Sequence, residues 1–334
     1  MKRTMPAPAY RAVRRRARVA LVACSAALAA PVALAAPSPL PPEVGYNYDE
    51  IETPRSAALN GASHASSNAI DGLFYNPANM AVTRVYHLAA FAQIWPEARR
   101  QSYGAAAVDS IESSVRLAGG IGGTWNLQDP DGIDRRSTDL RFAFALPFGD
   151  RFFLGVGGRY LWLKQDGFGP FGRSPASGGL GGADIVKGIT FDAGATVRPV
   201  DSLSLSIVGQ NLNNPDTTFQ PTTFGGGVGV KAGDFGAEAD VIGDFTSWGR
   251  TTVRTMGGLE YLVGDHVPLR LGYRYDEGAS SHSVSGGLGY IDQAFAVELA
   301  VRRVVSGDAA TAVVLGFTYH LESTGLTPSP ADTF

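Results

Sequence analysis

Apolar and polar residues alternate along the chain in segments of about ten residues, from near Val85 to near residue 322. In the segment 138–148, leucine and phenylalanine fill every second position from Leu140 to Phe148, and Asp139, Arg141 and Ala143 lie between them. A period of two predicts β-strands with one apolar and one polar face. The region 85–322 is therefore expected to be all-β.

The pattern predicts fourteen strands, which start near residues 86, 102, 114, 138, 151, 189, 202, 222, 235, 251, 267, 282, 293 and 310. Even-numbered connections such as 148–150 are short, and several odd-numbered ones, above all 165–188, are long. A tilted strand of ~9–11 residues crosses a bilayer. Outer-membrane barrels have short periplasmic turns, longer external loops and an even strand number. We therefore predict a 14-stranded antiparallel transmembrane β-barrel with both termini in the periplasm and 165–188 as its longest external loop.

The tryptophans offer a second sign of a membrane protein. Trp95, Trp125 and Trp162 end the first, third and fifth predicted strands, and Trp248 follows the ninth. This topology places all four at the outer end, where aromatic residues collect at the membrane interface. A secreted β-sandwich or propeller also buries an apolar face. It requires neither alternating connection lengths nor tryptophans at one end.

The N-terminus has the pattern of a secretory signal. Residues 1–18 hold seven basic residues and no acidic one, an apolar run follows, and Ala33–Ala35 fits a small-x-small cleavage site. The alternative, lipoprotein processing at Cys24, leaves only five apolar residues before the cysteine. We expect a signal peptide over 1–35, an N-terminal hatch or plug over 36–84, the barrel over 85–322 and a flexible tail over 323–334.

Composition narrows the function. Charged residues make up 18% of the chain, below the ~25% of soluble domains, and a single cysteine excludes a disulfide framework. The mature chain has an excess of acidic residues and no basic patch, which argues against nucleic acid as a partner. The five histidines have no metal-ligand spacing, and no Gly-x-Ser-x-Gly motif is present. We predict no enzyme, no cofactor and no metal site.

The polar face of the predicted strands carries charges of both signs. A charge that faces lipid costs several kcal/mol, so these residues are expected to face the barrel interior. They form either a solute path with a site for an anionic head group, or a self-neutralising network that stiffens the barrel and docks the hatch. The predicted interior charges include Arg141, Arg159, Asp192, Arg198, Arg254, Glu260, Arg270 and Glu298.

The most specific local motif is Asn76-Pro77-Ala78. Asn76 can cap a short helix whose first residue is Pro77. With the segment 55–62 before it and fourteen predicted strands after it, the motif resembles the hatch of FadL-type hydrophobic-compound transporters and the related PorV-like outer-membrane proteins. The resemblance implies a plugged fourteen-stranded barrel in the outer membrane of a Gram-negative bacterium.

Two functions follow from this resemblance. The first is a channel for passive uptake of small hydrophobic compounds, fatty acids or aromatics. The second is a PorV-like protein without transport, acting in protein export or as a structural barrel. The expected partners are outer-membrane lipid, a hydrophobic ligand and the barrel-assembly machinery. An apolar lumen pocket beneath 165–188 favours transport, whereas a charged, plug-filled lumen favours the second function.

The third predicted strand contains the glycine-rich stretch 118–123, with Gly119, Gly120, Gly122 and Gly123. Glycine weakens a strand and often marks a bulge. An apolar solute gains more by leaving sideways into lipid than by entering water. In FadL-type proteins the third strand is kinked at a side opening, so these glycines are candidates for a lateral gate. The alternative is close packing of the hatch against a glycine-lined wall.

Overall fold

The computed structural model describes residues 51–67, 69–128, 134–165 and 183–323. The predicted signal peptide, the first part of the predicted hatch (36–50), most of the connection 165–188 and nearly all of the tail lie outside the described residues. The domain boundaries that depend on them stay predictions.

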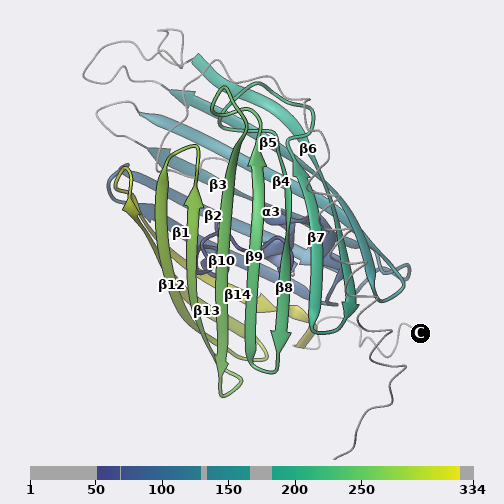
Figure 1. Ribbon diagram of the computed structural model, residues 1–334. Coiled ribbons are helices and arrows are strands. Elements are labelled where there is room, and N and C mark those ends of the chain that lie inside the picture. The colour runs from purple at the N-terminus through teal and green to yellow at the C-terminus, as the bar shows by residue number, and fades with distance from the viewer. Residues whose placement is uncertain (1–50, 68, 129–133, 166–182, 324–334) are drawn as a thin grey trace, which may run out of the picture. The chain divides into compact units, whose positions relative to one another are not determined.

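Within the described residues, fourteen strands form one closed antiparallel barrel, in which each strand pairs with its sequence neighbours and β14 pairs with β1 (Figure 1). This confirms the predicted fold class. The strands are β1 (Tyr86–Trp95), β2 (Arg100–Asp109), β3 (Ala118–Gln128), β4 (Arg135–Phe148), β5 (Phe152–Gln165), β6 (Ala183–Val200), β7 (Leu203–Gln210), β8 (Thr223–Ala232), β9 (Phe235–Asp244), β10 (Thr252–Val263), β11 (Val267–Asp276), β12 (Ser281–Ile291), β13 (Phe295–Ser306) and β14 (Thr311–His320).

Most strands start within three residues of the predicted positions, and two differ by more. β3 begins at Ala118 instead of residue 114, because the Asp109 carboxylate accepts hydrogen bonds from the Ile111 and Glu112 N–H groups and starts a turn. β6 begins at Ala183 instead of residue 189, where it pairs with β5 across a register shift after Leu163. The shift interrupts the alternation from which the strand start was predicted.

The two faces of the strands differ as the alternation predicts. On β4, Leu140, Phe142 and Phe144 are exposed on the outer surface, and Asp139 and Arg141 are buried inside. Short even-numbered connections carry glycine with positive φ, which only glycine adopts at little cost. These are Gly149 at 68°, Gly233 at 60° and Gly264 at 58°.

The tryptophan prediction is wrong in part. Trp125 is 51% exposed on the outer surface and Trp162 is also exposed, as an interface belt requires. Trp95 is only 1% exposed, because its position in β1 points inward, where the Arg100 guanidinium lies 4.3 Å from its ring centre. Trp248 is half-buried against Gly278.

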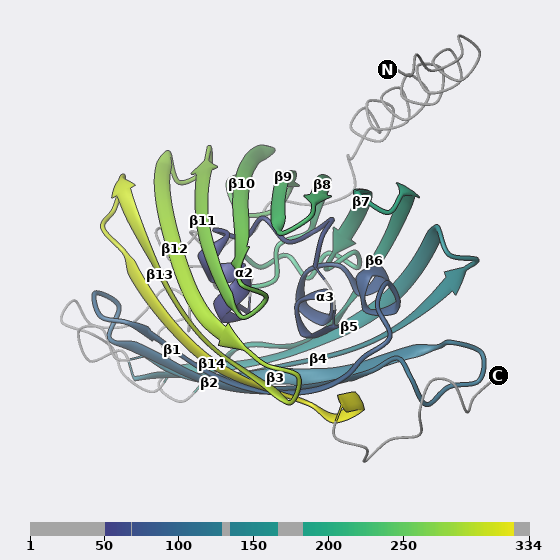
Figure 2. The ribbon, with the colours of Figure 1, turned by 90° about the horizontal axis from the view of Figure 1, so that it is seen from below.

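Residues 51–67 and 69–81 lie inside the ring of strands, with helices α2 (Pro54–Ala58) and α3 (Ala69–Tyr75) and the 3-10 helix η1 (Pro77–Ala81) (Figure 2). We call this segment the hatch. Its apolar side chains Leu73, Phe74 and Met80 pack in one cluster with residues of β1 to β5. No helix among the described residues is long and apolar enough to span a membrane.

Candidate functional site

The Asn76-Pro77-Ala78 motif fastens the hatch to β6. The Asn76 side chain caps η1, accepting from the Ala78 N–H at 3.2 Å, and its Nδ2 donates to the His64 carbonyl at 2.9 Å and to Thr196 Oγ1 at 3.1 Å. Gly194 on β6 permits this approach, because a side chain there would collide with the Asn76 amide. The motif therefore joins two parts of the hatch to each other and to the wall.

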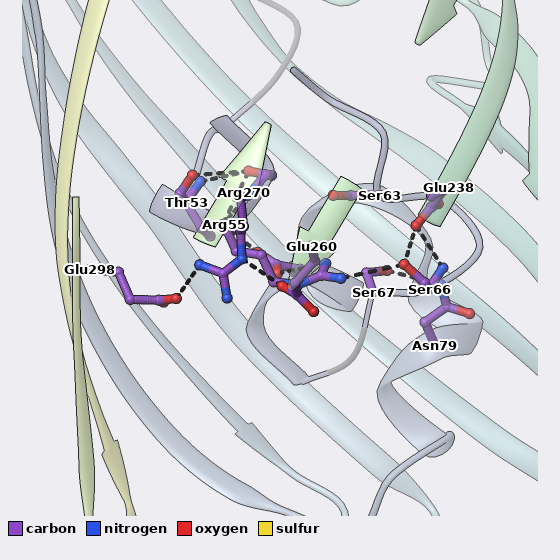
Figure 3. A network of polar contacts seen from close by, with 12 residues as sticks. Thr53, Arg55, Ser63, Ser66, Ser67, Asn79, Glu238, Glu260, Arg270 and Glu298 are labelled. Atoms are coloured by element: carbon purple, nitrogen blue, oxygen red, sulfur yellow. Dashed lines mark hydrogen bonds and ion pairs between the residues drawn. The ribbon is translucent and has the colours of Figure 1, made fainter. Parts of the chain in front are cut away.

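Two acidic residues of β9 hold the middle of the hatch. Asp240 Oδ2 accepts from the Ser63 and His64 N–H groups at 2.9 and 3.0 Å and lies 2.8 Å from His64 Nδ1. Glu238 accepts from the next two N–H groups, those of Ala65 and Ser66, at 2.6 and 3.1 Å (Figure 3). Four successive backbone donors thus receive partners from one strand, which offsets the desolvation of the three that are buried.

An ion-pair network links α2 to β10, β11 and β13 (Figure 3). Arg55 Nε donates to Glu260 Oε2 at 3.3 Å, and Arg55 Nη1 lies 3.5 Å from Asp71 Oδ2. Arg270 Nε donates to the same Glu260 oxygen at 2.5 Å, and Arg270 Nη1 pairs with Glu298 Oε1. Burial raises the pKa of the Asp71 carboxyl, and the Arg55 charge and the Thr53 hydroxyl oppose that rise.

A second group of predicted interior charges is buried beside η1. Arg159 Nη2 lies 2.6 Å from Asp139 Oδ2, and Arg141 Nη1 donates to the Phe74 carbonyl of the hatch at 3.0 Å. Asp192 accepts from the Asn211 N–H at 2.7 Å. Arg254 is buried in the same interior.

Two residues expected to touch the hatch do not hydrogen-bond to it among the described residues. Arg198 Nη2 donates to the Asp201 carbonyl at 2.7 Å, in the turn after β6, and Glu298 reaches the hatch only through Arg270 and Glu260. The hatch offers backbone N–H groups to the wall from Ser63 to Ser66, where the acids of β9 accept, and backbone carbonyls elsewhere, as at Phe74. In the sequence, the contact between wall and hatch is indicated by two acidic residues, Glu238 and Asp240, which are two positions apart and therefore share the inward face of β9.

The strand-3 glycines form no gap. β3 pairs with β2 from Gly119 to Gln128 and with β4 from Ala118 to Gln128 without a register shift. A Cβ on Gly120 would lie 2.9 Å from the Sδ of Met80 in the hatch, and one on Gly122 would lie 2.6 Å from the Ala106 Cβ. Every described residue of β3 from Gly119 on is thus paired on both sides, and Gly120 and Gly122 lie in close contact with their neighbours, so the lateral gate stays a prediction. Gly119 and Gly123 belong to the other face of β3 from Gly120 and Gly122, and both are paired with β4.

Two cavities lie on either side of the Arg55 network. One of about 280 Å³ lies between α2, α3 and the strands β1, β13 and β14. The other, of about 510 Å³, opens among the short turns around Asp201 and Asp234. Arg55, Glu260 and Arg270 line both cavities, so the network lies at their boundary. Within the described residues, no cluster of three or more histidine, cysteine, aspartate or glutamate side chains could hold a metal ion.

No protein-family model matches the chain, and no curated protein matches it. Solved structures are similar. CymD, a monoaromatic hydrocarbon channel, has a TM-score of 0.66 at 16% identity over 83% of this chain and 99% of its own. TbuX, the toluene transporter of Ralstonia pickettii, has a TM-score of 0.59 at 15% identity, over 82% of this chain and 99% of its own. A FadL homologue of Pseudomonas aeruginosa has a TM-score of 0.54 at 14% identity, over 81% of this chain and 99% of its own. The chain has the FadL-type fold.

Near the long-loop end of this FadL-type barrel, the described residues include a small buried apolar cluster. Leu161 and Leu163 of β5, Val186 of β6 and Phe219 of the connection after β7 form a buried cluster. Beside it, a cavity of about 10 Å³ has room for one water molecule. The resemblance that the hatch motif indicated is thus confirmed at the level of fold.

Proposed function

We propose that the protein is an outer-membrane channel for passive uptake of small hydrophobic compounds, fatty acids or aromatics. The observation that carries the proposal is a closed fourteen-stranded barrel with a hatch in its lumen, in the fold of the CymD channel and the TbuX transporter. The proposal assigns the protein no enzymatic activity. Its exposed apolar strand faces are suited to outer-membrane lipid.

The interior suggests a route. A solute meets the apolar cluster around Phe219 first, then the hatch, and then the two cavities beyond it. Passage between the two cavities would bring a solute past Arg55 and Glu260, which line both of them. The even-numbered turns are assigned to the periplasm, together with both termini. Insertion by the barrel-assembly machinery belongs to the same proposal.

Lateral exit at strand 3 stays a prediction. It requires pairs between β3 and its neighbours to separate, and all of them are formed in this structure. An exit through the cavity among the short turns needs no broken strand pair.

One observation favours the second candidate, a PorV-like protein without transport. In the described part of the lumen, the apolar side chains of the hatch pack against the wall, and buried charges of the wall are paired with one another. A plug that never moves suits a structural or export-related barrel.

Uptake separates the two. Cells that lack other hydrophobic-compound channels should take up labelled toluene or oleate faster when they produce the protein. Cells with the empty vector provide the baseline. Uptake at the baseline rate for both compounds, with the barrel present in the outer membrane, would leave the second candidate.

A further inference from the structure

The cavity of about 280 Å³ has one apolar and one charged side. Ile70 of α3, Phe91 of β1 and Ala296 of β13 form the apolar side. The other side carries the titratable lining residues of the cavity, which are Arg55, Asp71, His87, Glu260, Arg270, Glu298 and His320. An apolar cavity of roughly 150 Å³ holds benzene, so this volume suits one substituted aromatic ring.

The charged side offers acceptors to a ligand. Glu260 Oε2 accepts hydrogen bonds from Arg55 and Arg270, and Glu298 Oε1 accepts one from Arg270. Among the described residues, Glu260 Oε1 and Glu298 Oε2 accept no hydrogen bond. The Glu260 and Glu298 side chains are 29% and 15% exposed, and that of Arg270 only 4%.

The donors of Arg55 are occupied or covered. Its Nε donates to Glu260 and its Nη2 to Ser66 Oγ, and its Nη1 is buried beside Asp71. A molecule in the cavity therefore finds the donors of Arg55 taken, and the second oxygens of Glu260 and Glu298 open to a donor. A donor on the ligand gains a charge-assisted hydrogen bond there, whereas a carboxylate meets like charge.

We propose that this cavity selects, among small aromatic solutes, those that carry a hydroxyl or ammonium donor, and rejects those that carry a carboxylate. The inference rests on the proposed function and deepens it, because it chooses aromatics over fatty acids. The ring lies against Ile70 and Phe91, and the donor reaches the open oxygen of Glu260 or Glu298.

Four ligands with one skeleton test the selection. Toluene, benzyl alcohol, benzylamine and benzoate are titrated at neutral pH into the full mature protein in lipid nanodiscs. Benzyl alcohol and benzylamine should bind roughly tenfold more tightly than toluene, the ratio expected for one hydrogen bond to a charged group. Benzoate should bind most weakly of the four.

Variants assign the effect to the cavity. Glu298→Gln removes one negative charge and keeps the shape, so benzylamine should lose affinity, benzoate should gain it and toluene should not change. Asp150→Asn removes the same charge from an exposed turn and should change none of the four. Ala89→Leu fills part of the cavity and should weaken all four.

Benzoate that binds as tightly as benzyl alcohol, or a benzylamine-to-benzoate ratio unchanged by Glu298→Gln, overturns the selection. Either result is compatible with toluene uptake by cells, so the proposed function survives it. No binding by any of the four ligands also overturns the inference. If cells also take up no toluene above the baseline, the proposed channel function is overturned as well.

Discussion

Gly119 and Gly120 are neighbours in the sequence, but they serve opposite faces of the wall. A Cβ on Gly119 would meet only the Phe144 ring at 3.8 Å, an ordinary contact. A Cβ on Gly120 would lie 2.9 Å from Met80 Sδ and 3.0 Å from a Val108 methyl group. At the scale of one residue, the position within the alternation decides whether glycine is needed.

Gly120→Val should therefore lower stability and loosen the hatch. Overpacking of this kind costs about 1–3 kcal/mol. The measurement is heat-dependent unfolding in detergent, followed by the shift of the folded band on a gel. Gly119→Ala is the matched control and should unfold at the wild-type temperature. An equal loss in both variants would mean that glycine is needed for strand formation and not for hatch packing.

Glu277 follows β11 and ties two connections together. Its carboxylate accepts from Arg250 Nη1 at 2.7 Å and from the Val253 N–H at 3.0 Å. The Arg250 hydrogen bond is the largest cause that lowers the pKa of this carboxyl below its ordinary value of 4.5. Because the folded pKa is the lower one, the stabilising contribution is present above pH 4.5 and is lost as the pH falls through the folded pKa.

Carboxyl-carbon NMR, with the resonance assigned by Glu277→Gln, should give a titration midpoint below 4.5 for Glu277. Arg250→Ala should move that midpoint upward. A midpoint at 4.5 or above in the wild type would show that the link does not form in solution.

At the scale of elements, the hatch and the wall are held by different interactions. The wall is a closed ladder of backbone pairs from β1 to β14. The hatch adds contacts to that ladder but no strand, through Asp240, Glu238 and the Arg55 network. The barrel should therefore fold without the hatch.

Deletion of residues 37–84 should leave a heat-resistant barrel with a large, unselective conductance in planar bilayers. The reason is that the hatch fills the interior on which Leu73, Phe74 and Met80 pack. The full-length protein in the same bilayer is the reference. Conductance at the reference level from a folded deletion variant would mean that the hatch does not block the pore.

At the scale of the whole molecule, the alternation of connections predicts the orientation in the membrane. Ser280 lies in the connection after β11 and Asp201 in the turn after β6, and both are exposed. The single native cysteine, Cys24, lies in the predicted signal peptide.

Ser280→Cys should be labelled on whole cells by a thiol reagent that does not cross the outer membrane, and Asp201→Cys should not. Both should be labelled after the cells are broken, which controls for exposure. Labelling of Asp201→Cys alone on whole cells would invert the topology.

The sequence alone determined the number of strands, their faces and the position of the hatch motif. The sequence of each strand shows by itself which face meets lipid, because the lipid face requires apolar side chains at every second position and the interior face does not. The Leu140–Phe148 alternation and the short turns at Gly149 and Gly233 needed no knowledge of other strands. The same rule misled for Trp95, because its ring lies over Arg100 inside and not in the lipid interface.

Only the tertiary structure decided which charges meet the hatch, whether β3 is open, and where the lumen is hollow. Ser63 and Asp240 are 177 residues apart, and the closure of the barrel alone brings them together. From the sequence, Gly120 and Gly122 are equally compatible with a gate and with a packing surface. The structure adds that Met80 and Ala106 lie close beside them. The cavity beside Glu298 depends on α2, α3 and three strands at once, so no local pattern encodes it.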